Sequence, residues 1–152
     1  MQFTPKKLKV MANITMAYII NYLNKYCSLA LEEAFSAFIK SQTYRALMNL
    51  KSELCLEMAP DVLFMYADES GTDIDADNFD SFNDAYTISD RLQYTVNMSE
   101  AFREKHKINT SQYPSFIKKH KAWEYIYTNY EDLCGFPKEK FFSELNTAMK
   151  LQ

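Results

Sequence analysis

The scarcity of turn residues is the feature that most limits what this chain of 152 residues can fold into. Only two glycines and four prolines occur, whereas a β-rich protein of this size needs many turn residues to reverse its strands. Hydrophobic residues make up 47% and charged residues 24% of the chain, a composition typical of folded globular proteins. The sequence therefore predicts an all-α protein whose helices are joined by short connections.

Apolar residues recur at helical spacing along most of the chain. Pro60 and Pro137 stand where proline suits the first turn of a helix. Residues 70–84 are acidic, contain Gly71 and lack sustained periodicity, which indicates a loop. We expect about eight helices, over 11–25, 31–40, 43–50, 60–69, 87–106, 111–119, 121–130 and 137–151.

Two stretches of the chain resemble each other, which predicts an internal repeat. The matched cysteines and prolines fall at helix boundaries and not on a repeating apolar stripe, so duplication explains them better than a chance alignment of two amphipathic segments. The matched pairs, with two short gaps, are Phe38 and Phe116, Tyr44 and Trp123, Leu47 and Ile126, Leu54 and Leu133, Cys55 and Cys134, and Pro60 and Pro137.

This repeat predicts two related helical modules, 1–70 and 87–152, joined by an acidic linker over 71–86. A module of about 60 residues built from short helices buries only a thin core by itself. We therefore expect the two modules to share one core.

Charge is distributed unevenly along the chain. The formal net charge is −3 and the pI is about 5.4, which gives no general reason to expect nucleic acid or an anionic membrane as a partner. Eleven acidic residues and no Lys or Arg lie between Ser52 and Asp90. The basic residues gather later in the chain, at Arg103, Lys105, Lys107, Lys118, Lys119 and Lys121.

We interpret this basic stretch as a surface that binds an acidic protein partner. Two alternatives stay open. Because Tyr113, Phe116 and Trp123 are interleaved with the lysines, the stretch 103–121 also suits a nucleic-acid-binding regulator. The acidic and basic runs would alternatively neutralise each other between the modules. A homo-oligomer stays open as well.

No catalytic or cofactor-binding motif is present, and with two glycines a phosphate-binding loop of the usual kind cannot be built. The two histidines, His106 and His120, and the three cysteines have no metal-ligand spacing. Cys55 and Cys134 each follow a leucine and are interpreted as buried small hydrophobes. The sequence predicts a protein that is not an enzyme and has no cofactor, with a small enzyme or a calcium-binding protein as the weaker alternatives.

The odd number of cysteines (Cys27, Cys55 and Cys134) fits poorly with a disulfide framework and favours reduced thiols in the cytoplasm. The apolar stretch from Val10 to Leu23 is interrupted by polar residues. It is therefore interpreted as neither a signal peptide nor a membrane span.

Three motifs carry a resemblance in the first half: Phe38-x-x-Ser41-x-Thr43-Tyr44-x-x-Leu47, Leu54-x-x-Glu57 and Val62-x-x-Met65-Tyr66-x-x-Glu69. This half resembles small uncharacterised helical proteins of bacteria and their mobile elements. The second half, at Phe116-Ile117-x-x-His120 and Tyr125-Ile126-x-x-x-Tyr130-x-x-Leu133, is similar to another small helical domain of unknown function. Genes for such domains often neighbour those of ADP-ribosyltransferase-like toxins, so the resemblance implies an antitoxin-like or accessory role.

The acidic loop is similar to the calcium loop of an EF-hand, with carboxylates at Asp73, Asp75, Asp77 and Asp84. Asn78 stands where the loop requires glycine, and Asp80 stands where a hydrophobic residue normally anchors it. Position 12 holds the shorter aspartate in place of glutamate. We therefore predict no dependence on calcium. Micromolar binding in a calorimetric titration, lost in Asp73→Asn, would contradict this.

Overall fold

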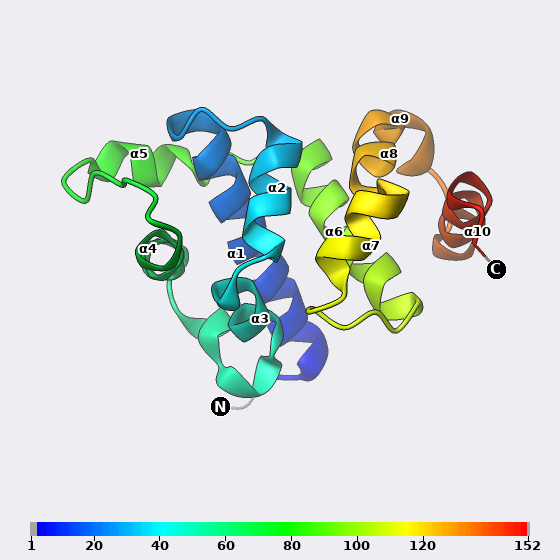
Figure 1. Cartoon of the computed structure of the whole chain (residues 1–152), viewed down its shortest axis with the longest axis horizontal. Coiled ribbons are helices and arrows are strands. Elements are labelled where there is room, and N and C mark those ends of the chain that lie inside the picture. The colour runs from blue at the N-terminus through cyan, green and yellow to red at the C-terminus, as the bar shows by residue number, and fades with distance from the viewer. Residues whose placement is uncertain (1–2, 152) are drawn as a thin grey trace. The chain divides into compact units, whose positions relative to one another are not determined.

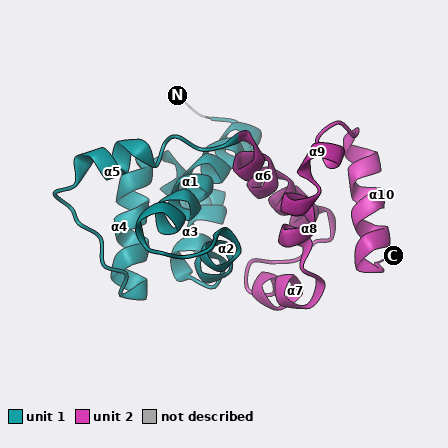
Figure 2. Ribbon diagram, turned by 90° about the horizontal axis from the view of Figure 1, so that it is seen from above, with its two compact units in different colours: residues 1–89 teal, residues 90–152 magenta. Residues whose placement is uncertain are grey.

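The fold is entirely helical in the part of the chain that the structure describes, residues 3–151 of a computed structural model (Figure 1). Of the residues described, 73% are helical and none lies in a strand, and eight of their ten α-helices have seven residues or more. The all-α prediction is confirmed. The chain divides into two compact units, Met1–Ser89 and Asp90–Gln152 (Figure 2).

The first unit is built around its longest helix, α1 (Pro5–Tyr26). Thr4 starts this helix by accepting a hydrogen bond from the backbone N–H of Lys7 at 3.2 Å, and Pro5 occupies the first turn, where proline is tolerated. The other elements of the unit contact α1; they are α2 (Leu31–Ile39), α3 (Gln42–Met48), the 3-10 turns η1 (Leu50–Ser52) and η2 (Leu54–Leu56), α4 (Ala59–Ser70) and α5 (Phe79–Asp84).

Aromatic rings and one carboxylate join the short helices of this unit. Phe38 of α2 packs edge-on against Tyr44 of α3 and Tyr66 of α4, with ring centroids 5.8 and 5.4 Å apart. Glu69 of α4 accepts hydrogen bonds from the backbone N–H groups of Gln42 and Thr43, at 2.6 and 2.9 Å. Its carboxylate therefore satisfies two of the donors that the start of α3 leaves open.

The acidic segment differs from the loop expected over 70–84, because its second half forms α5. Phe82 of this helix is buried and its ring lies 5.7 Å from that of Tyr22. The carbonyl of Ala85 accepts a hydrogen bond from the Asn21 side chain at 2.8 Å. Residues 79–85 are thus packed onto α1 as part of the first unit, and the unit continues to Ser89.

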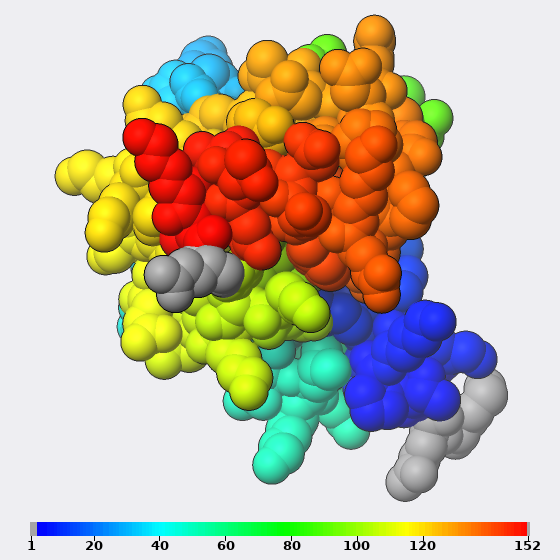
Figure 3. Space-filling view, turned by 90° about the vertical axis from the view of Figure 1, so that its right-hand side faces the viewer, coloured from blue at the N-terminus to red at the C-terminus, as the bar shows by residue number. Residues whose placement is uncertain are grey.

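The second unit is arranged around α6 (Asp90–Lys105), which contacts α8 (Ala122–Thr128) and α9 (Tyr130–Leu133). Its remaining helices are α7 (Tyr113–His120) and α10 (Lys138–Met149). Helix α10 lies at the surface of this unit, where Figure 3 shows it in orange and red. The side chains of Phe141 and Leu145 on α10 are fully buried.

Both units begin with a long helix and two short ones. Two 3-10 turns in the first unit, or the single turn α9 in the second, then lead to a helix of 12 residues, and the first unit adds α5. The repeat and the shared core stay predictions. Tyr44 and Trp123, which the repeat matches, are both buried, at 0% and 2% exposure. Phe116 differs from its match Phe38, because it is only half-buried.

Replacing Trp123 by alanine should destabilise the protein by roughly 3–5 kcal/mol, since a large buried ring is lost and a cavity remains. Chemical denaturation followed by circular dichroism measures this change. Thr128→Ala, at an exposed position of the same helix, is the control and should change the free energy of unfolding by less than about 0.5 kcal/mol. Near-native stability of Trp123→Ala would contradict the packing described here.

Candidate functional site

Five of the six predicted partner-binding residues are exposed lysines at helix ends of the second unit. Lys105 lies in the last turn of α6, and Lys118 and Lys119 lie in the last turn of α7. Lys107 and Lys121 follow these two helices with left-handed backbone conformations, each at a φ of 54°. None of the five forms an ion pair with the described residues of its unit. We refer to them as the lysine group.

The prediction that Arg103, the sixth residue, contacts a partner is wrong, because only 8% of this residue is exposed. Its Nε and Nη2 both donate to Oε1 of Glu100, at 3.2 and 3.0 Å, and Glu100 is fully buried. Nη1 donates to the carbonyl oxygen of Ile108 at 2.9 Å. The guanidinium therefore holds the end of α6 against the following loop and is not available to a partner.

Tyr113 packs beside this ion pair, with its ring centroid 5.8 Å from the guanidinium carbon of Arg103. Its hydroxyl donates to the carbonyl oxygen of Ser99 at 3.2 Å. Burial, and then the negative charge of Glu100, raises the pKa of Tyr113 well above its usual value. The tyrosine thus stays neutral, and the cluster is a structural one that joins α6 to the start of α7.

Aromatic side chains connect the two ends of the lysine group. The buried ring of Phe102 lies 4.5 Å from that of His106 and 6.1 Å from that of Phe116, and Phe116 in turn lies 4.7 Å from His120. Phe142 of α10 joins the same set, 6.4 Å from Phe102 and with the ammonium of Lys105 5.8 Å from its own ring centroid. Apart from Phe102, these rings are half-buried and form an aromatic band.

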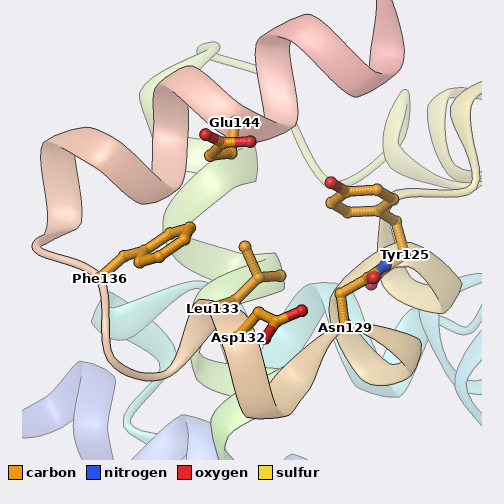
Figure 4. A pocket seen from close by; sticks show the side chains of 6 residues that line it. All are labelled: Tyr125, Asn129, Asp132, Leu133, Phe136 and Glu144. Carbon is orange, nitrogen blue, oxygen red and sulfur yellow. The ribbon is translucent and has the colours of Figure 1, made fainter.

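A hollow of about 250 Å³ lies elsewhere in the same unit, between α8, α9 and α10 (Figure 4). Tyr125 and Phe136 stand on opposite sides of it, and Glu144 of α10 projects into it across from Leu133. The six residues that line it are Tyr125, Asn129, Asp132, Leu133, Phe136 and Glu144. No sequence motif marks this hollow, because its residues come from three helices and the connections between them.

The acidic residues that suggested a calcium loop do not converge. Asp75 accepts a hydrogen bond from the backbone N–H of Asp77 at 3.0 Å, and Asp84 accepts one from the hydroxyl of Tyr26 at 3.1 Å. Over residues 3–151 no group of three or more His, Cys, Asp or Glu side chains is placed to hold a metal ion. The absence of calcium dependence stays a prediction.

The three cysteines are free thiols. Cys55 is buried, as predicted, and burial raises the pKa of its thiol. Cys134 was predicted to be buried like Cys55, and this is wrong. It follows the end of α9 and is exposed, with its thiol 3.5 Å from the carbonyl oxygen of Glu131.

Comparison with known proteins does not assign the chain to a family. No family model matches the chain, and the comparisons with curated proteins and with solved structures found no significant match. Within the described residues, no helix is both long and apolar enough to cross a membrane.

The Glu100–Arg103 pair predicts a specific cost for removing one charge. Glu100→Gln should destabilise the protein by roughly 3–5 kcal/mol, because the buried guanidinium loses its counter-charge. The matched control is Glu104→Gln, since Glu104 is 3.9 Å from Nη2 of Arg103 but its side chain is 52% exposed. That change should cost less than about 1 kcal/mol. Equal effects of the two variants in urea denaturation would contradict the structural role of Arg103.

Proposed function

We propose that this protein is a non-catalytic interaction protein that binds an acidic protein partner through the second unit. The observation that supports the proposal is the combination of the lysine group with the aromatic band. The five lysines are exposed and form no ion pair with the described residues of their unit. Each lies within two positions of His106, Phe116 or His120 in the sequence, whose rings are only half-buried. Half-buried aromatic rings provide contact area in protein interfaces, and unpaired charges of one sign attract a partner of the opposite sign.

Lysines near a helix C-terminus also stabilise the helix itself. This effect explains only three of the five lysines. Lysine in the last turn of a helix interacts favourably with the helix dipole. This explains Lys105, Lys118 and Lys119. Lys107 and Lys121 lie beyond the helix ends in a left-handed conformation that favours glycine. At both positions the backbone conformation favours glycine, and the lysine side chains add charge to the same surface.

A nucleic-acid-binding regulator is the second candidate, because lysines beside aromatic rings also suit a single strand with stacked bases. The packing of the rings favours a protein partner. Phe116 already contacts Phe102 and His120, so less of its face is open to a base. The antitoxin-like or accessory role in bacteria, which the resemblance of the two halves implies, is one form that a non-catalytic interaction protein takes.

Charge reversal tests the proposal. In the variant with Lys118, Lys119 and Lys121 replaced by glutamate, the association rate with the purified partner should fall about tenfold or more at low salt, because electrostatic steering is lost. Raising the ionic strength should reduce the difference, since screening acts over about 8–10 Å. The free energy of unfolding should change by less than about 1 kcal/mol for each exposed lysine.

The matched control replaces Lys6, Lys7 and Lys51, three exposed lysines of the first unit, by glutamate. It changes the net charge equally and should leave association nearly unchanged. Unaltered binding with reduced stability in the first variant would contradict the proposal and would assign its lysines to neutralising the chain's own acidic run. If the native chain captures nucleic acid and not protein, and the charge-reversal variant does not, the result would favour the nucleic-acid-binding regulator.

A further inference from the structure

The polar side chains that line the hollow between α8, α9 and α10 offer more hydrogen-bond acceptors than donors. Nδ2 of Asn129 donates one of its two N–H groups to the carbonyl oxygen of Tyr125 at 2.9 Å, and the amide oxygen is an acceptor for a ligand. The carboxylates of Asp132 and Glu144 form no ion pair with the described residues. The hydroxyl of Tyr125 accepts as readily as it donates. This excess of acceptors favours a ligand with several hydrogen-bond donors, and the two carboxylates favour a cation.

The aromatic side chains of the hollow are suited to the same ligand. Tyr125 and Phe136 stand on either side of the space (Figure 4), and the face of an aromatic ring attracts a cation, a guanidinium especially. Phe136 already makes one such contact, with Nζ of Lys140 4.1 Å from its ring centroid. Lys140 is not among the residues that line the hollow. This ammonium neutralises part of the local charge but does not fill the space.

The volume of the hollow and the charge around it limit the class of ligand further. A volume of about 250 Å³ lies below the range of roughly 300–1,000 Å³ that is usual for sites of whole cofactors or drug-sized molecules. One long side chain is a better match. The segment 122–149, which contains the hollow, has five acidic residues and two lysines. This local excess of negative charge suits a basic segment of another protein.

We propose that this hollow binds the arginine side chain of a basic segment in a partner protein. Arginine fits better than lysine for two reasons. Its planar guanidinium presents five donors to carboxylate and amide oxygens at once, and it stacks on aromatic faces with a smaller loss of hydration than an ammonium. Glu144 and Asp132 bind the charge, the oxygen of Asn129 accepts one further hydrogen bond, and Tyr125 and Phe136 enclose the plane.

The test uses a nuclear magnetic resonance titration of the full ¹⁵N-labelled chain with N-acetyl-L-arginine N-methylamide, whose capped ends mimic a peptide. The backbone resonances that shift should cluster in residues 125–144. The matching citrulline derivative has nearly the same shape without the charge, and its affinity should be at least about fivefold lower, the factor that corresponds to about 1 kcal/mol for one charge interaction. Equal binding of the two probes, or shifts that avoid residues 125–144, would overturn the proposal.

Three single variants locate the interaction. Asp132→Asn and Glu144→Gln should each weaken the arginine probe by about two- to fivefold, the range for a solvent-exposed charge pair. Glu139→Gln removes an exposed charge from the same helix as Glu144 but outside the hollow, and it should change nothing. If Glu139→Gln lowers the affinity for the arginine probe as much as Glu144→Gln does, the effect comes from nonspecific charge attraction, and the proposed site is overturned.

Free L-arginine distinguishes a partner's side chain from a small-molecule ligand. It carries its own ammonium and carboxylate, so tighter binding of the free amino acid than of the capped probe would contradict a partner segment as the occupant. None of these variants touches the lysine group, so the result is independent of the charge-reversal experiment. Either proposal can therefore fail while the other stands.

Discussion

The shortness of the helices is the constraint on which the rest of this structure depends. Apart from α1 and α6, no helix in the described residues exceeds 12 residues, and isolated helices of this length are marginal in water. Each short helix therefore depends on contacts with a longer one and on caps such as Glu69, which holds the start of α3. In the second unit, α6 supports α8 and α9, and these helices carry part of the hollow. Its geometry thus depends on packing around α6.

Local signals in the sequence were sufficient for the fold class and for most helix positions. Pro60 lies in the first turn of α4, and Pro137 directly precedes α10, because proline's fixed φ and missing N–H suit these places. Helix α5 could not be found in the same way. Its six residues make fewer than two helical turns, too few for an apolar period to show. Its stability depends on burying Phe82 beside Tyr22 of α1. That contact between residues 60 positions apart is tertiary.

The candidate sites were less predictable, because the sequence does not show which side chain a charged residue contacts in the folded protein. Arg103 counted as one of six basic residues, but Glu100, three positions earlier, pairs with it inside the unit. An acidic residue at this spacing on a helix was the available signal. The hollow offered none: Asn129, Leu133 and Glu144 surround one space only after the chain turns between α9 and α10. Its polar residues look like ordinary surface when taken singly.

The second unit separates charge along its own sequence, and the helix ends show how it does so at little cost. Residues 103–121 contain six basic residues and one acidic residue, whereas acidic residues dominate 122–149. Lys107 and Lys121 occupy left-handed positions, where a side chain costs roughly 1 kcal/mol relative to glycine. A cation near a helix C-terminus recovers about 0.3–1 kcal/mol. For Lys107 this offsets part of the cost. Lys121 also stands at the N-terminus of α8, where the dipole disfavours a cation. Both lysines therefore add charge to the surface at a small net cost in folding.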